Sequence, residues 1–233
     1  MANPTDTQFV QLSDEWKRRL KREAGLWLTR IYTDPSAALE QYIEDCDHMY
    51  FRTDCEGRLI GFLLVKWNDP LEINYQGTNY ILVYAGLSAV SPANAQRHVG
   101  ESLFRTFSHS CQNRQLHLSK SVLIWYTTAN PIVLKKALRI SSDHQPNPAC
   151  HAYDSISEGA IRAISQRMNA TLDTSTYPWV LREASRLRYT DSQLNAILTS
   201  CQSLDQALVS MFCKVDERRG DRLICICRPG NLS

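Results

Sequence analysis

The stretch Tyr80–Phe107, which reads YILVYAGLSAVSPANAQRHVGESLFRTF, constrains the fold of this chain most strongly. Its apolar first part predicts a strand over Tyr80–Val90, and a short turn containing Pro92 follows. A helix is expected over Gln96–Cys111, because apolar residues recur there at three- and four-residue spacing. The N–H groups at a helix N-terminus lack intrahelical partners, and the helix dipole adds positive potential there. A strand leading into such a terminus therefore predicts an anion site, and we expect a phosphate-bearing ligand.

The bulk composition is that of an ordinary globular chain. Its 233 residues, 43% of them hydrophobic and 21% charged, fit one large domain or a domain with an elaboration. The net charge of +2 predicts no overall positive electrostatic potential that would attract nucleic acid. The segments Lys17–Arg22 and Arg182–Arg188 are nevertheless locally basic. No apolar run is long enough for a membrane helix, and the N-terminus lacks signal-peptide regions. We expect no membrane partner and a cytoplasmic location.

The eight cysteines are scattered and form no CxxC pair or metal-ligand spacing. We therefore expect no metal site. Cys225 and Cys227 flank Ile226 in an apparent strand, so their side chains should lie on one face. Buried, reduced thiols are the expected state, which agrees with a cytoplasmic compartment.

The remaining pattern alternates strands and helices, with helix caps expected at Ser13, Asp34 and Asn130. A loop is expected over Pro70–Gly77. In the segment 141–205 the signals weaken: a loop is expected at His144–Pro148, and helical stripes follow it. The other expected elements are strands at Phe9–Leu12, His48–Arg52, Leu59–Trp67 and Ser121–Tyr126, and a terminal hairpin of Ala207–Val215 with Arg222–Cys227.

The run Arg97-His98-Val99-Gly100-Glu101-Ser102 follows the long strand at the start of the predicted helix. It resembles the signature of the GNAT superfamily of N-acyltransferases: Gln or Arg, two residues, Gly, one residue, then Gly or Ala. Ser102 is a small residue at the last position, and the Asn130-Pro131 step fits the next strand–helix junction of that family. The resemblance covers Phe9 to about Leu138 and the chain from Ala207 onward.

The resemblance implies an α/β (α+β) fold with a mixed, centrally splayed sheet flanked by helices. Residues 1–233 would form a single domain, with 141–205 as a mostly helical insert covering the acceptor side. An acyl-CoA, most simply acetyl-CoA, would lie in the splay as co-substrate. An N–H near Ala89 or Val90 would polarise its thioester carbonyl. The donor-binding residues implied in this way are Ala89, Val90, Arg97, His98, Val99, Gly100, Glu101, Ser102 and Asn130.

The expected activity is direct transfer of the acyl group to a primary amine of a small-molecule acceptor. Many family members carry a tyrosine seven residues after the asparagine, but Ala137 stands at that position here. Members with a glutamate base on the central strand would need an acid in 82–88, where none occurs. The candidate catalytic residues are therefore Tyr126, Ser88 and Asn130. The first two are more often packing or hydrogen-bonding residues, and Asn130 could equally be a simple cap, a role that can coexist with catalysis.

Two alternatives to this function stay open. The donor could be linked to an acyl carrier protein or a tRNA that docks on the basic helix at Lys17–Arg22, although nucleic acid is otherwise not expected. The chain could also be a non-catalytic GNAT-like binding module, which the alanine at position 137 and the acid-free strand favour. Tyr153, Tyr177 and Trp179 of the insert could wall the acceptor site or only anchor the insert. We expect a monomer or a homodimer.

Overall fold

The computed structural model describes residues 7–94, 98–118, 120–141 and 143–229. Its strands form one mixed sheet in the order β1-β2-β3-β4-β5-β9-β8-β7, with β6 paired to β9. The pair β4–β5 is parallel, and the neighbouring pairs β3–β4 and β5–β9 are antiparallel. The strands are β1 (Gln8–Gln11), β2 (His48–Thr53), β3 (Leu59–Tyr75), β4 (Thr78–Val90), β5 (Ser121–Thr128), β6 (His144–Gln145), β7 (Thr171–Asp173), β8 (Val180–Arg182) and β9 (Arg222–Cys227).

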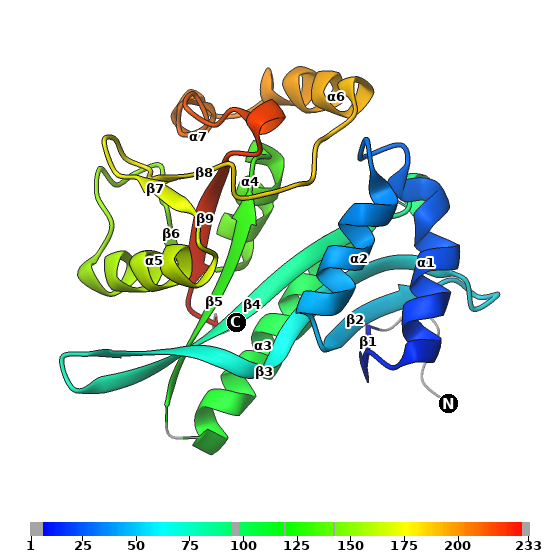
Figure 1. The fold of residues 1–233 in the computed structure, drawn as a ribbon, viewed down its shortest axis with the longest axis horizontal. Coiled ribbons are helices and arrows are strands. Elements are labelled where there is room, and N and C mark those ends of the chain that lie inside the picture. Colours follow the sequence, from blue (N-terminus) through cyan, green and yellow to red (C-terminus); the bar gives the residue numbers. More distant parts are fainter. Residues whose placement is uncertain (1–6, 95–97, 119, 142, 230–233) are drawn as a thin grey trace.

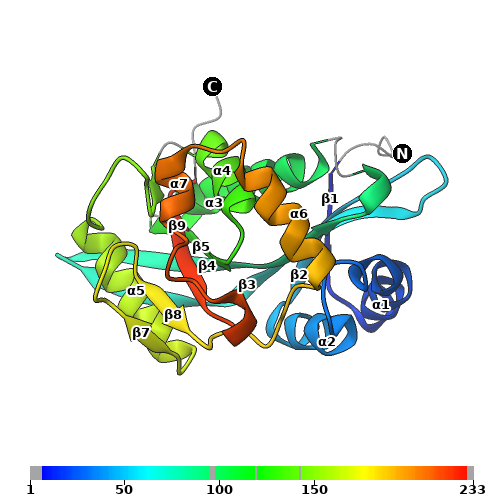
Figure 2. The ribbon, with the colours of Figure 1, turned by 90° about the horizontal axis from the view of Figure 1, so that it is seen from above.

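Helices cover both faces of this sheet (Figures 1 and 2). Helices α3 and α4 pack on one face, whereas α1, α2 and α5 pack on the other. Helices α6 and α7 contact α4. The helices are α1 (Asp14–Leu28), α2 (Pro35–Asp45), α3 (Val99–Leu118), α4 (Pro131–Ile140), α5 (Ser155–Arg167), α6 (Asp191–Cys201) and α7 (Gln206–Ser210), with 3₁₀ turns η1 (Pro92–Asn94) and η2 (Glu217–Arg219).

The three predicted helix caps are confirmed. The side chains of Ser13, Asp34 and Asn130 accept hydrogen bonds from backbone N–H groups in the first turns of α1, α2 and α4. Proline at the first helical position of α2 and α4 fits because its missing N–H would be unpaired there anyway. These local signals fix where α2 begins and start α4 directly after β5.

The sheet splays between β4 and β5. Their parallel pairing ends at Tyr84 opposite Trp125, whereas β4 stays paired with β3 as far as Val90. The pairing of β3 and β4 is irregular near Gly86, and a Cβ there would lie 2.9 Å from Sγ of Cys46, the residue that caps the C-terminus of α2. Glycine therefore lets β4 approach α2 closely at the splay.

The irregularity in β4 also changes the face of the sheet toward which its side chains point. Val83 and Ala85 belong to the cluster under α3 and α4, whereas Leu87 and Ala89 pack toward α1 and α2. In a regular strand these four odd-numbered residues would share one face. The shift turns Ser88 and Val90 toward the α3 side, beside the start of that helix.

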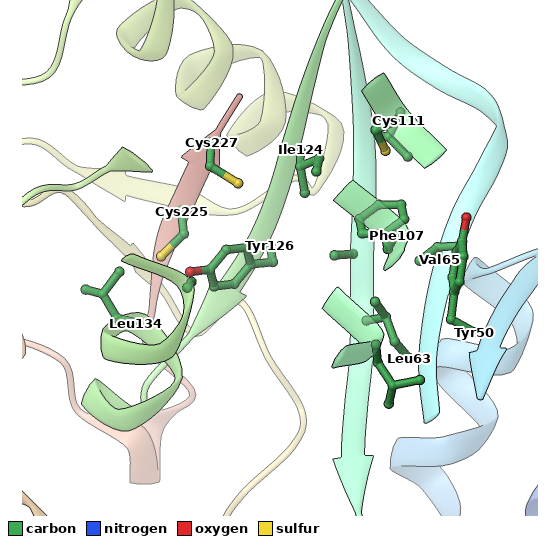
Figure 3. Close-up of a cluster of buried hydrophobic side chains, with 14 of the residues drawn as sticks. Tyr50, Leu63, Val65, Phe107, Cys111, Ile124, Tyr126, Leu134, Cys225 and Cys227 are labelled. Carbon is green, nitrogen blue, oxygen red and sulfur yellow. The ribbon is translucent and has the colours of Figure 1, made fainter. Parts of the chain in front are cut away.

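The apolar core under α3 and α4 is shown in Figure 3. The prediction that Cys225 and Cys227 share a face is confirmed, since both are buried in this cluster and both point from the same side of β9. Ile224 and Ile226 pack on the opposite face with α5. Not every cysteine is buried, because Cys55 and Cys213 are exposed. No helix within the described residues is long and apolar enough to cross a membrane.

Three sequence-based expectations are wrong. The expected loop Pro70–Gly77 is mostly strand, because β3 continues past a pairing irregularity between Lys66 and Leu71. Ala207–Val215 is not a strand; it contains α7 and turns, and β9 pairs with β8 instead, with Val180 opposite Leu223. The segment 141–205 also carries β6, β7 and β8, which extend the sheet, besides its helices.

Candidate functional site

A cavity of about 450 Å³ lies at the splay. Its lining comes from β4 at Ala85–Val90, from the end of β5, from the first turns of α3 and from α4. The α1–α2 connection and the segment before α6 complete the wall. The predicted site residues Ser88, Ala89, Val90, Gly100, Glu101, Tyr126 and Asn130 all line this cavity.

The N-terminus of α3 opens into the cavity through Gly100 and Glu101. Val99 is buried under β3, and a Cβ built on Gly61 would lie 2.6 Å from Cγ1 of Val99, so this packing fixes the start of the helix. A Cβ on Gly100 would meet only Cγ2 of Val90, at 3.5 Å. The space beside Gly100 is therefore open to a ligand that approaches the backbone, which fits a pyrophosphate.

The other residues of the predicted motif lie around this turn. Arg97 lies outside the described residues. His98 has a positive φ of 52° and an exposed ring that pairs with Glu101 Oε2 at 3.1 Å. Ser102 donates its N–H to the carbonyl of His98, and its Oγ lies 3.2 Å from Oγ1 of Thr7. His98 and Ser102 shape the turn and do not line the cavity.

The backbone of β4 presents polar groups to the splay. Ser91 donates its N–H to the carbonyl of Ile60 on β3, at 2.9 Å. Successive residues of a strand point their backbone groups to opposite edges. The N–H and C=O of Ala89 therefore face β3, whereas those of Ser88 and Val90 face the splay, where β4 has separated from β5. This geometry favours Val90 over Ala89 as the donor to a carbonyl in the cavity.

Tyr126 lies on the α3–α4 side of the cavity and is hydrogen-bonded to a buried histidine. Its hydroxyl is 2.7 Å from Nε2 of His144, whose Nδ1 lies 3.4 Å from the carbonyl of Pro146. Since Nδ1 must donate to that carbonyl, Nε2 accepts from Tyr126. Burial raises the pKa of Tyr126 well above its ordinary value and lowers the pKa of His144 to about 4. Both groups are therefore neutral at pH 7.

Asn130 combines its cap with a second contact. Its Oδ1 accepts the N–H of Ile132 at 2.9 Å. Burial raises the pKa of Tyr189, and a hydrogen bond from the Asn130 side chain opposes that rise. Asn130 therefore caps α4 and also lines the cavity together with Tyr189.

Sequence reasoning missed a strap that closes one side of the cavity. Residues 187–190, which precede α6, run beside residues 30–33 between α1 and α2. Thr33 donates its N–H to the carbonyl of Arg188, Thr190 donates to that of Ile31, and Tyr32 stacks on Tyr189 at 5.4 Å. This strap, defined as residues 187–190, joins the two arms of the splayed sheet. The missed residues that line the cavity include Tyr32, Tyr42, Lys136, Leu187, Tyr189, Gln193 and Arg222.

The three aromatic residues noted in the insert lie elsewhere. Tyr153 contacts both Tyr177 and Trp179, and all three pack with α5 against the sheet. None of them lines the cavity. They anchor the insert, and the strap supplies the wall. Among the described residues, no group of three His, Cys, Asp or Glu side chains is placed to hold a metal ion.

No protein-family model matches the sequence, and no curated protein matches it. Among solved structures, a putative GNAT-family acetyltransferase from Desulfovibrio desulfuricans is similar over 96% of this chain and 99% of its own, with 9% identity and a TM-score of 0.44. A probable N-acyltransferase from Enterococcus faecalis V583 is similar over 57% of this chain, with 11% identity and a TM-score of 0.41. The similar region spans about a third of that longer protein, 32%.

A third similar structure is AtaT complexed with acetyl-methionyl-tRNAfMet, with 15% identity, a TM-score of 0.38, and coverage of 57% of this chain and 83% of its own. All three identities are low and all three TM-scores lie below 0.5. No activity, substrate or partner is therefore carried from these proteins to this chain. The splayed, mixed sheet expected from the GNAT resemblance is present in the chain itself.

Proposed function

We propose that this chain is a GNAT-type N-acyltransferase that moves an acyl group, most simply acetyl, from acyl-CoA to a primary amine of a small-molecule acceptor. One observation carries the proposal: the splay of β4 from β5 and the N-terminus of α3 open into the same cavity. A thioester with a pyrophosphate at one end and a polar arm needs those two features together. Helix N–H groups meet the phosphates, and free strand groups meet the arm.

The donor would enter on the α3 side of the sheet. The N–H groups at the start of α3 and the cation of Lys136 on α4 would hold the phosphates. The Val90 N–H would donate to the thioester carbonyl and stabilise the negative charge that develops there during attack. In the transfer, the amine nitrogen forms the amide bond, the C–S bond breaks, and one amine proton ends on the departing thiolate.

The thiolate needs a proton donor because position 137 holds alanine. Tyr126 lines the cavity on the donor side and is neutral, so its hydroxyl can serve this purpose once it leaves His144. Ser88 is the exposed alternative on β4. Asn130 is a positioning residue, since it caps α4 and lines the cavity.

The insert, residues 141–205, is proposed to cover the acceptor side. The strap supports this, because it crosses from the insert to the α1–α2 connection over the cavity. A volume of about 450 Å³, shared by the donor arm and the acceptor, favours a small acceptor over a polypeptide tail.

A donor linked to tRNA or to a carrier protein has less support. Lys17, Arg19, Lys21 and Arg22 of α1 each form an ion pair with a neighbouring carboxylate. Their charge is thus partly compensated, which weakens a polyanion-binding face. Binding of such a donor would depend steeply on salt.

Native mass spectrometry against CoA, acetyl-CoA and longer acyl thioesters tests the proposal, followed by thiol-release assays with a panel of amines. We expect a one-to-one adduct, with acetyl or another short chain preferred, and turnover with at least one amine. A CoA adduct without turnover on any amine would instead favour a non-catalytic binding module. Absence of any adduct at low salt would overturn the proposal.

A further inference from the structure

Arg222, the first residue of β9, is a buried cation in the cavity wall. Arg222 is 6% exposed and lines the cavity. Alternation along β9 puts it on the face of Ile224, which packs away from α3 and α4. The start of α3, where the donor phosphates are proposed to bind, lies on the other face (Figure 2). Arg222 is therefore available to a second ligand.

The guanidinium of Arg222 is held in place by hydrogen bonds that do not use all of its N–H groups. It donates to the carbonyl of Asp221 at 2.8 Å and to that of Leu187 at 2.7 Å. It forms an ion pair with Glu217, whose Oε1 is 3.5 Å away and also accepts the N–H of Tyr189 at 2.8 Å. These contacts within the described chain account for three of the five N–H groups of an arginine. They orient the side chain and leave N–H donors for a ligand.

Three tyrosines, Tyr32, Tyr42 and Tyr189, line the same cavity as Arg222. They come from the α1–α2 connection, from α2 and from the strap, respectively. Burial raises the pKa of each tyrosine, and the positive charge of Arg222 opposes that rise in each case.

Two of these tyrosines reach the cavity from different elements. Tyr42 comes from α2 and Tyr189 from the strap, and both line the cavity. A phenolic hydroxyl can donate a hydrogen bond as well as accept one, so the O–H groups of Tyr42 and Tyr189 can act as donors to a ligand in the cavity.

We propose that the acceptor is a small amine that carries a carboxylate, and that Arg222 binds this carboxylate together with the hydroxyls of Tyr42 and Tyr189. The inference rests on the proposed acyl transfer and names the acceptor class of the same site. A planar carboxylate with one negative charge matches a guanidinium fork. The other lysine or arginine in the cavity lining, Lys136, lies on α4, across the sheet from this point.

The carboxylate site orients the amine. Arg222 lies just beyond Leu223, which pairs with Thr128 at the end of β5. A ligand anchored there would extend its amine end toward the gap between β4 and β5, where the Val90 N–H would donate to the thioester carbonyl. Binding of the carboxylate thus positions the nitrogen for attack, since a held reactant reacts far faster than a free one.

The test compares matched acceptors. L-amino acids, β-alanine and γ-aminobutyrate are assayed beside their carboxamides with acetyl-CoA, and kcat/KM is measured for each pair. We expect the best carboxylate acceptor to exceed its carboxamide by about 100-fold or more, as loss of two charge-assisted hydrogen bonds predicts. Equal rates for acids and amides, or turnover only with amines that lack a carboxylate, would overturn the inference.

Arg222→Gln should reduce the ratio between acid and amide to within about threefold. Because this variant also loses contacts to Leu187 and Asp221, Tyr42→Phe and Tyr189→Phe provide a second measurement. Each should lower the ratio about tenfold, as removal of one hydrogen bond to a charged group predicts. An unchanged ratio in folded variants of all three would refute the assignment. CoA affinity, measured by calorimetry on the same samples, separates the two proposals. If the wild-type chain does not bind CoA, the proposed acyltransferase function is contradicted. If it binds CoA but shows no preference for carboxylate acceptors, only the acceptor site is contradicted.

Discussion

Replacement of Gly100 by valine tests the phosphate cradle at the start of α3. The new Cβ would meet only Cγ2 of Val90, at 3.5 Å, which is ordinary van der Waals contact. Valine is also a better helix residue than glycine, by about 0.4 kcal/mol. The free energy of unfolding should therefore change little. The branched side chain, however, would occupy the open space through which phosphates reach the backbone.

Loss of two charge-assisted hydrogen bonds, each contributing about 1.5–3 kcal/mol, should weaken CoA binding by at least about 100-fold. Isothermal titration calorimetry with CoA measures this change, and circular dichroism with thermal unfolding checks the fold. Gly159→Val is the matched control, since Gly159 lies inside α5 with no atom within 4 Å of a built Cβ. CoA affinity should be unchanged in the control. A Gly100→Val variant that is folded and binds CoA within about threefold of the wild type would refute the cradle.

Further outcomes follow from the same geometry. Lys136→Ala should weaken CoA binding about tenfold at low salt, and less in 1 M salt, because screening shortens the reach of its charge; calorimetry at two salt concentrations measures this. The pKa of His144 is lowered to about 4 by burial, so stability is fully present above about pH 6.5 and is lost as the pH falls toward 4. Urea titrations should therefore show the wild type losing about 3 kcal/mol more than His144→Gln over that window, and parallel pH curves would contradict this. Gly220→Ala should lower the free energy of unfolding by more than about 2 kcal/mol, because φ is 92° and a Cβ would collide with the Ser185 carbonyl. Gly57→Ala, with φ of 76° and no neighbour, should cost only about 1 kcal/mol; equal losses in the two would refute the collision.

The sequence predicted the half of the site that depends on local signals. The caps at Asp34 and Asn130, the long strand β4 and the glycine near the start of α3 all act within a few residues of their position. Their arrangement in space then follows from the splayed sheet. The central cavity and its donor-side lining were therefore within reach of sequence reasoning.

The proposed acceptor half of the cavity could not be predicted, because it depends on contacts between distant segments. Tyr189 reaches the cavity only because the strap runs beside residues 30–33. Arg222 was visible as a charged residue at the head of an apolar strand, but its neighbours come from α2 and the strap. The spacing of these residues along the sequence does not predict that they line the same cavity.

The errors in the fold have the same origin. Ala207–Val215 is a short apolar run, and periodicity alone cannot separate a strand from a helix at that length. Asp205 caps α7 there, and the strand that pairs with β9 comes earlier in the chain as β8. The expected loop at Pro70 fails because proline is tolerated where the pairing of β3 with β4 is interrupted.

A crystal structure of the protein with CoA tests the central claim most directly. The account predicts the pyrophosphate against the backbone of Val99–Glu101 and the pantetheine arm between β4 and β5, hydrogen-bonded to Val90. It also predicts the thiol inside the cavity that Tyr126 and Asn130 line. CoA bound outside the splay, or no CoA in crystals grown at millimolar concentrations, would contradict the account.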